Sequence, residues 1–304
     1  MRVTNTMMAQ NLLLNIENTQ TGMVNLQNQL STGYKLNQPS DDPVATANVM
    51  QLQSTISTVG QWQQNASSAL DLMKTTSSSL DNVISMVQQV QSLAVQGSSD
   101  TLTSSDRSAL ASQIDQIIGQ LQSVANTQSG DRYIYSGTNS SQPPYQSGQA
   151  WAGNSDAVNF QVGNNLSIDT SVNGNQVFNT TNTGGEGLLS GSSTGTGGIL
   201  EDLSTALKTD NTAGISATIN TLQDNVDSLT AINADLGARI NRLTSVQSQL
   251  TTSNTNLQQN VSDLRDTDMA QAITNFTQMQ NTFNAALQVG AKIIEPSLVN
   301  YIQS

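Results

Sequence analysis

The sequence predicts a mainly α-helical protein: an elongated antiparallel helical bundle or coiled coil, with a terminal helix pair and a small β-rich inserted domain. Three observations lead to this prediction. Apolar residues recur with heptad spacing near both ends of the chain and along two central stretches. The 304 residues are 36% hydrophobic and 11% charged, a composition that suits helical rods with narrow seams. A glycine-rich stretch, residues 139–200, interrupts the helical pattern.

Both ends of the chain carry an apolar seam of the kind found in coiled coils. Residues 1–36 contain three charged side chains and residues 269–304 contain two. Neither end is therefore predicted to form a helix with a charged outer face. We expect the two ends to pair and also to pack against neighbouring subunits, although an ordinary pair within one chain is the alternative. The predicted assembly interface comprises Leu12, Ile16, Met23, Leu26, Leu30, Met269, Ile273, Phe276, Phe283, Leu287 and Ile294.

The first helix should break where the sequence reads STGYKLNQPSDDP. Gly33, Pro39 and Pro43 are all unfavourable inside a helix. Asp42 followed by Pro43 predicts a helix start, with the aspartate as N-cap and the proline in the first helical position. Asp41 and Asp42 could instead form a catalytic carboxylate pair, but that role needs a pocket and usually a third group. Capping is therefore the favoured interpretation.

Helical periodicity fills most of the remaining chain. A second helix should run to a turn near Gly97–Ser105, and a third should end near Gly130. The pattern resumes at Ile199 and continues to Leu264. There the heptad phase slips by one residue, at RDTDM, which predicts a joint between a long helix and the C-terminal one.

The interrupting stretch shows strand signals. Residues 158–162 alternate apolar and polar side chains, and residues 166–168 continue the alternation. Asn173–Gly174 is a hairpin signal, and a Gly/Ser/Thr loop should occupy residues 183–198.

These features predict three domains. They are a terminal helical assembly domain (residues 1–40 with 266–304), a helical rod domain (41–140 with 199–265) and a β-rich outer insert domain (141–198).

Composition excludes several functions. The net charge is −12 and no Lys/Arg cluster exists, so we expect no nucleic-acid partner. Cysteine and histidine are absent, which excludes disulfides and Cys/His zinc sites and removes the commonest acid–base group. We therefore expect no cofactor, no metal and no enzymatic activity. No apolar run predicts membrane insertion or a secretory signal, which alone would suggest the cytoplasm.

One acidic cluster invites a metal hypothesis. Asp263, Asp266 and Asp268 lie close together in sequence, beside Arg265. The cluster lacks the glycine and the terminal glutamate of an EF-hand loop. A charged joint between helices is the favoured interpretation.

Several strings resemble a known family. LSTGYKLNQPSDDPVA (Leu30–Ala45) resembles the N-terminal signature of the flagellin superfamily, and within it is most similar to the hook-associated protein 3 branch. RDTDMAQAITNFTQMQ (Arg265–Gln280) resembles the C-terminal block shared across the superfamily. The ending GAKIIEPSLVNYI (Gly290–Ile302) resembles the same branch. Pro39 and Pro43 depart from the pattern of filament flagellins.

The resemblance implies a structural subunit of the bacterial flagellum, an adaptor at the hook–filament junction. It implies partners: identical subunits in a ring, the neighbouring hook-associated protein and flagellin, and an export chaperone before secretion. Type III export, which needs no cleaved signal peptide, would place the protein outside the cell despite the missing signal. Two alternatives stay open: the filament flagellin itself, and a secreted surface adhesin or enzyme with its activity in residues 140–200.

Overall fold

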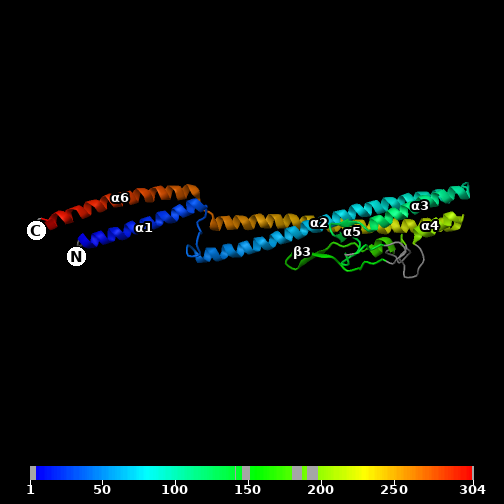
Figure 1. Ribbon diagram of the computed structural model, residues 1–304, viewed down its shortest axis with the longest axis horizontal. Helices are drawn as coiled ribbons and strands as arrows, with labels where there is room; N and C mark the ends of the chain where they lie inside the picture. Colours follow the sequence, from blue (N-terminus) through cyan, green and yellow to red (C-terminus); the bar gives the residue numbers. More distant parts are fainter. Residues whose placement is uncertain (1–4, 141, 146–150, 180–186, 190–197, 303–304) are drawn as a thin grey trace. The chain divides into compact units, whose positions relative to one another are not determined.

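The predicted fold class is confirmed: the protein is mainly helical, with long antiparallel helix pairs and a small strand-containing insert (Figure 1). The computed structural model describes residues 5–140, 142–145, 151–179, 187–189 and 198–302. Its α-helices are α1 (Asn5–Thr32), α2 (Pro43–Gly97), α3 (Ser104–Ala125), α4 (Ile199–Lys208), α5 (Thr212–Arg265) and α6 (Met269–Ile302).

The packing divides the chain into two compact units. Residues 1–58 and 253–304 form unit 1, and residues 59–252 form unit 2. Because α2 and α5 are long, each contributes a segment to both units. The three-domain division made from the sequence draws its boundaries at other residues and stays a prediction.

In unit 1, α1 lies beside α6 and the two run antiparallel, so the first residue of α1 and the last residue of α6 are at the same end of the pair (Figure 1). Helix α1 ends at Thr32, where Gly33 adopts a φ of +76° that side-chain-bearing residues rarely take. Helix α2 begins at Pro43. The carboxylate of Asp42 accepts hydrogen bonds from the backbone N–H groups of Val44 (3.0 Å) and Ala45 (2.9 Å) and so caps this helix.

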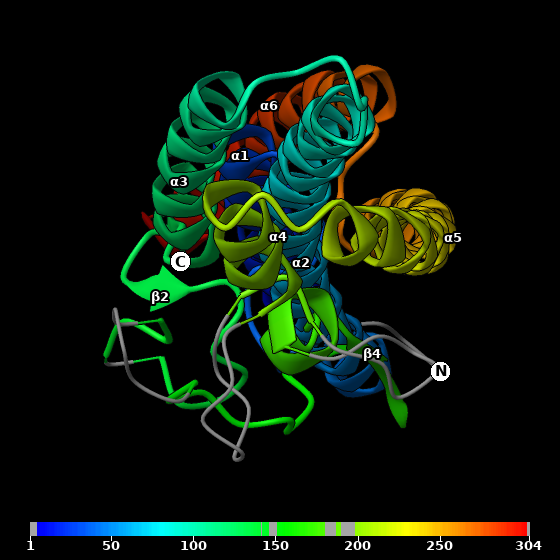
Figure 2. The same ribbon diagram turned by 90° about the vertical axis from the view of Figure 1, so that its right-hand side faces the viewer.

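Unit 2 holds one contiguous hydrophobic core. Helices α3 and α4 lie side by side against the unit 2 segments of α2 and α5 (Figure 2). Helix α5 contributes one leucine per heptad, all at most 9% exposed: Leu222, Leu229, Leu236, Leu243 and Leu250.

A polar residue lies in the same seam, between Leu229 and Leu236. Asn233 accepts a hydrogen bond from the Ser77 hydroxyl (2.9 Å) and donates one to the Asp81 carboxylate (2.7 Å). Both partners lie on α2. These bonds fix the register in which α5 meets α2, since a polar group in an apolar seam tolerates few alternative partners.

The insert contains one hairpin where the alternation predicted strands. Strand β3 (Asn159–Gly163) pairs antiparallel with β4 (Leu166–Asp169), and Asn165 in the turn adopts a φ of 59°. A shorter hairpin, β1 (Gln128–Ser129) with β2 (Arg132–Tyr133), follows α3. Helix α3 itself ends at Ala125, slightly earlier than predicted.

The hairpin predicted at Asn173–Gly174 is wrong. A single π-helical turn, η1 (Asn175–Asn179), follows instead. The backbone carbonyl of Asn173 accepts from the N–H groups of Gln176 (3.0 Å) and Val177 (3.2 Å), so the chain coils rather than reversing. Most of the loop predicted for residues 183–198 lies outside the described residues.

The turn η1 delivers an aromatic side chain to the core of unit 2. Phe178 is fully buried and contacts the rings of Tyr135 and Tyr145 edge-on, each with a centroid separation of 5.1 Å. The Tyr135 hydroxyl donates to Ser79 on α2 (2.9 Å). The insert therefore shares its core with the helices of unit 2.

A buried arginine joins two turns of unit 2. The Arg107 side chain is 6% exposed; its Nε donates to the carbonyl of Gly97 (3.0 Å) and another guanidinium nitrogen donates to the carbonyl of Ser99 (2.8 Å). The guanidinium also pairs with Asp210, which lies in the connection between α4 and α5. One side chain thus holds the α2–α3 turn against the α4–α5 turn.

We predict that Arg107→Met lowers the free energy of unfolding by about 2–3 kcal/mol, because it removes the guanidinium donor from the carbonyl of buried Gly97 and leaves Asp210 without its cationic partner. The matched control is Lys208→Met, since Lys208 pairs with Asp115 and both side chains are nearly half exposed. That change should cost less than about 1 kcal/mol. Urea denaturation followed by circular dichroism measures both, and equal losses would contradict the role given to Arg107.

Candidate assembly surface of the terminal helices

Helices α1 and α6 meet along one face of each, here called the inner seam. On α6 every residue of the inner seam is buried or half-buried, and the spacing alternates between four and three. The α6 residues of the inner seam are Ala272, Phe276, Met279, Phe283, Ala286 and Gly290.

The inner seam packs large side chains against small ones. A Cβ atom at Gly22 would lie 2.9 Å from the Met279 methyl carbon, and one at Gly290 would lie 3.0 Å from a Leu12 methyl carbon. These glycines let the helices approach closely. The large apolar residues that α1 contributes to the inner seam are half-buried, and the sequence analysis placed each of them in the predicted assembly interface: Leu12, Ile16, Met23, Leu26 and Leu30.

The structure divides the predicted α6 residues between two faces. Phe276 and Phe283 belong to the inner seam. Met269, Ile273 and Leu287 are 44%, 53% and 47% exposed and form what we call the outer stripe. Ile294 lies in the part of α6 whose side chains are outside the described residues.

Sequence reasoning missed four residues of the contact, Gly22, Ala272, Met279 and Ala286. The signal that could have found them is the heptad recurrence of small residues opposite large ones. A search for the recurrence of large apolar residues overlooks this signal, because alanine and glycine carry little apolar surface.

Exposed apolar side chains are concentrated in unit 1. Among the described residues, 13 large hydrophobic side chains are exposed, and 12 of them belong to unit 1; Val95 is the exception. Besides the outer stripe they include Met7, Met8, Leu13, Leu14, Val24, Tyr34, Val44, Met50 and Val289.

The same helices carry almost no charge. Glu17 is the one ionisable side chain in α1, and residues 269–291 of α6 have none. Exposed apolar side chains on a surface with few charges are typical of faces that pack against another protein.

A joint within unit 1 connects the α1–α6 pair to the segments of α2 and α5 in the same unit. The backbone N–H of Lys35 donates to the carbonyl of Arg265 (2.7 Å), and the N–H of Thr267 donates to the carbonyl of Gly33 (2.9 Å). The guanidinium of Arg265 lies 4.0 Å from the centre of the Tyr34 ring. The α1–α2 connection is thereby tied to the α5–α6 connection at RDTDM, where the phase slip predicted a joint.

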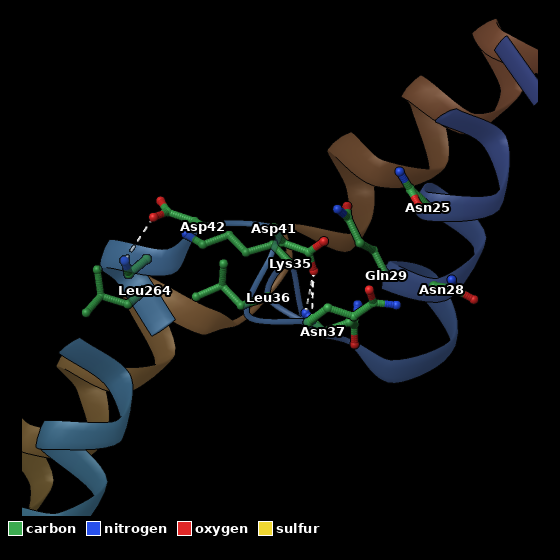
Figure 3. A pocket seen from close by; sticks show the side chains of 11 residues that line it. Asn25, Asn28, Gln29, Lys35, Leu36, Asn37, Asp41, Asp42 and Leu264 are labelled. Carbon is green, nitrogen blue, oxygen red and sulfur yellow. Dashed lines mark hydrogen bonds between the residues drawn. The ribbon is translucent and has the colours of Figure 1, made fainter. Parts of the chain in front are cut away.

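A polar pocket of about 590 Å³ lies beside this joint, lined by amide side chains of α1, by the α1–α2 connection and by Leu264 (Figure 3). Asp41 accepts hydrogen bonds from the backbone N–H groups of Asn37 (2.9 Å) and Gln38 (2.8 Å). Asp41 thus holds the connection, while Asp42 caps α2. Both aspartates that raised a catalytic hypothesis therefore bond to backbone N–H groups.

Electrostatics at the joint favour an ionised aspartate. The Ser262 hydroxyl, and after it the Arg265 guanidinium and the charge of Lys35, lower the pKa of Asp266 below its usual value. Because the folded-state pKa is lowered, this stabilisation is present above the unfolded pKa and is lost as the pH falls through the folded one.

The described residues contain no group of three or more His, Cys, Asp or Glu that could hold a metal ion. Nor does any helix in the described ranges combine the length and apolar character needed to cross a bilayer.

The arrangement defines a class of protein: a helical structural subunit whose paired ends carry apolar surface for assembly. Residues 3–140 match the bacterial flagellin N-terminal helical region, and residues 219–302 match the bacterial flagellin C-terminal helical region. The chain belongs to the bacterial flagellin family, and as such it is a structural protein rather than an enzyme.

Within the family, the chain is similar to hook-associated proteins. It is 27% identical over 300 residues to flagellar hook-associated protein 3 of Escherichia coli (strain K12), covering 94% of this chain and 95% of that protein. The Salmonella typhimurium protein of the same name is 27% identical over 306 residues, covering 96% and 95%. The crystal structure of hook associated protein-3 from Legionella pneumophila shares the fold, with a TM-score of 0.58 over 71% of this chain and 98% of that chain at 17% identity.

We predict that Tyr34→Ala loosens the joint, because it removes the ring beneath Arg265. Loss of an exposed cation–π contact should speed amide hydrogen exchange at Lys35 and Thr267 roughly two- to fivefold. Tyr34→Phe keeps the ring and serves as the matched control. The contact would have no role if both variants exchanged at the rate of the unmodified chain.

Proposed function

We propose that this chain is the structural subunit that joins the flagellar hook to the filament, outside the cell. Similarity to hook-associated protein 3 over more than nine-tenths of the chain supports this role. The observation that carries the mechanism is the concentration of exposed apolar side chains in unit 1.

The surface of unit 1 suits a ring of identical subunits. The outer stripe lies on α6, whereas Leu13, Leu14 and Val24 lie on α1. Two different faces on one molecule allow head-to-tail contacts, which close into a ring when the rotation between subunits permits. In this proposal the outer stripe of one subunit packs against the α1 face of the next.

Burial of these side chains supplies the driving force. Fully burying a leucine, isoleucine or methionine side chain stabilises by roughly 1.5–3 kcal/mol, so each half-exposed residue contributes about 1 kcal/mol on assembly. A dozen such residues together contribute on the order of 12 kcal/mol, which adds to the stabilisation that the inner seam already gives the two terminal helices.

The same faces supply contacts to other flagellar components. A junction subunit also meets the neighbouring hook-associated protein on one side and flagellin on the other, and a chaperone would cover the apolar faces before export. The filament flagellin role is disfavoured by Pro39 and Pro43, which depart from the filament pattern. The adhesin or enzyme hypothesis for residues 140–200 gains no support from Tyr145 and Phe178, which are buried in the core of unit 2.

We predict that Ile273→Asp abolishes assembly and leaves the monomer folded. The side chain is 53% exposed, so an aspartate there is hydrated in the monomer but must be desolvated in the assembly. The cost is about 3 kcal/mol or more per contact, a weakening of roughly a hundredfold or greater. The measurement is filament attachment and motility in a strain that lacks the native gene and expresses the variant.

The chain offers a matched control in Val95→Asp. Val95 is 55% exposed and lies in unit 2, so the same chemical change is made outside the proposed interface. Val95→Asp should support normal filament attachment. If Ile273→Asp also did so, the outer stripe would not be an assembly interface.

A further inference from the structure

The methionines of the chain are distributed unevenly between the two units. Met7, Met8, Met50 and Met269 are 53%, 40%, 65% and 44% exposed, and all four belong to unit 1. Met73, in unit 2, is fully buried. The accessible thioethers therefore lie on the unit that carries the apolar faces.

Among the described residues, these four thioethers are the sulfur groups most exposed to an oxidant, while Met23 and Met86 are half-buried. The chain has no cysteine, so no thiol reacts first. Methionine oxidation needs access to the side chain and converts a flexible apolar group into a polar one. The four exposed methionines meet the first condition in the monomer.

We propose that oxidation of Met7, Met8, Met50 and Met269 by a peroxide switches off assembly through unit 1. The proposal rests on the function proposed above. In each reaction a sulfur lone pair attacks one oxygen of hydrogen peroxide, and the O–O bond breaks. A sulfur–oxygen bond forms, the sulfur is oxidised by two electrons, and the displaced hydroxide takes the remaining proton to leave as water.

The product is poorly suited to an apolar contact. A sulfoxide oxygen is a strong hydrogen-bond acceptor, and its burial without a donor is unfavourable. Met269 is one helical turn from Ile273 in the outer stripe, and Met7 is two turns from Leu14 on α1. Oxidation therefore adds polar groups to the faces that assembly must desolvate.

The fold of the monomer should survive the same treatment. Met73 is sealed in the core of unit 2, and Met279 packs against Gly22 within the inner seam. These side chains are less accessible than the four on the surface. The modification thus separates assembly from folding, and methionine sulfoxide reductases, which reverse it, would restore the surface.

The test uses the purified full chain and hooks isolated from a strain that lacks its gene. The chain is treated with dilute hydrogen peroxide, and peptide mass spectrometry locates the added oxygen atoms. Circular dichroism verifies that helicity is retained, and co-sedimentation with the hooks measures binding. We expect oxidation at the four exposed methionines and binding weakened roughly tenfold or more.

The matched variant replaces the four methionines by leucine, as Met7→Leu, Met8→Leu, Met50→Leu and Met269→Leu. Leucine has similar volume and apolarity but cannot form a sulfoxide. This variant should bind hooks equally well before and after peroxide. Treatment of the oxidised native chain with methionine sulfoxide reductases should restore its binding.

The outcomes separate the two proposals. If the unmodified chain fails to bind hooks, the proposed junction function is wrong. If it binds, and the chain carrying all four sulfoxides binds equally well, the junction function stands and the oxidative switch is wrong. Loss of binding by the leucine variant after peroxide would also overturn the switch, because the damage would then lie elsewhere.

Discussion

The pairing of α1 with α6 determines the character of unit 1, because each helix has one partner and can bury one face. The inner seam uses that face on each helix. A protein in which both helices were amphipathic would have charged outer faces. Here Met269, Ile273 and Leu287 occupy the outer face of α6, and α1 carries a single charge. This leaves apolar surface exposed on the helix pair, and in the proposed function a second layer from neighbouring subunits covers it.

Unit 2 shows the alternative solution within the same chain. Its segments of α2 and α5 are covered by α3, by α4 and by aromatic residues of the insert such as Phe178. With more than one neighbour for each helix, both apolar faces can be buried. Exposure of a large apolar residue is correspondingly rare, Val95 being the example among the described residues. The difference between the units is therefore the number of layers around each helix rather than their composition.

Local signals in the sequence predicted well where the helices begin and end. They predicted poorly which face of α6 contacts α1. Asp42–Pro43 and the slip at RDTDM act through neighbouring residues, so the sequence placed these limits where α2 begins and α5 ends. The face that α6 turns toward α1 depends on fit between two helices. The large apolar side chains of Ile273 and Leu287 gave the stronger periodic signal in the sequence. The close approach of the two helices instead places Ala272 and the other small residues of the inner seam against α1. The hairpin predicted at Asn173–Gly174 is wrong for a related reason: the burial of Phe178 outweighs the local preference of this dipeptide for a hairpin.

The joint explains how the chain keeps the outer stripe outside. Each residue advances an α-helix by about 100°, so Ala272 in the inner seam and Ile273 in the outer stripe differ by one step of rotation. A slip of α6 by one residue would turn Ile273 and Leu287 inward and remove the surface available for assembly. The bonds from Lys35 to Arg265 and from Thr267 to Gly33 anchor the chain within four residues of the start of α6. Because backbone groups make both bonds, the register is set by the chain path itself. One face of α6 then packs against α1, and the other stays available for the intersubunit contact proposed above.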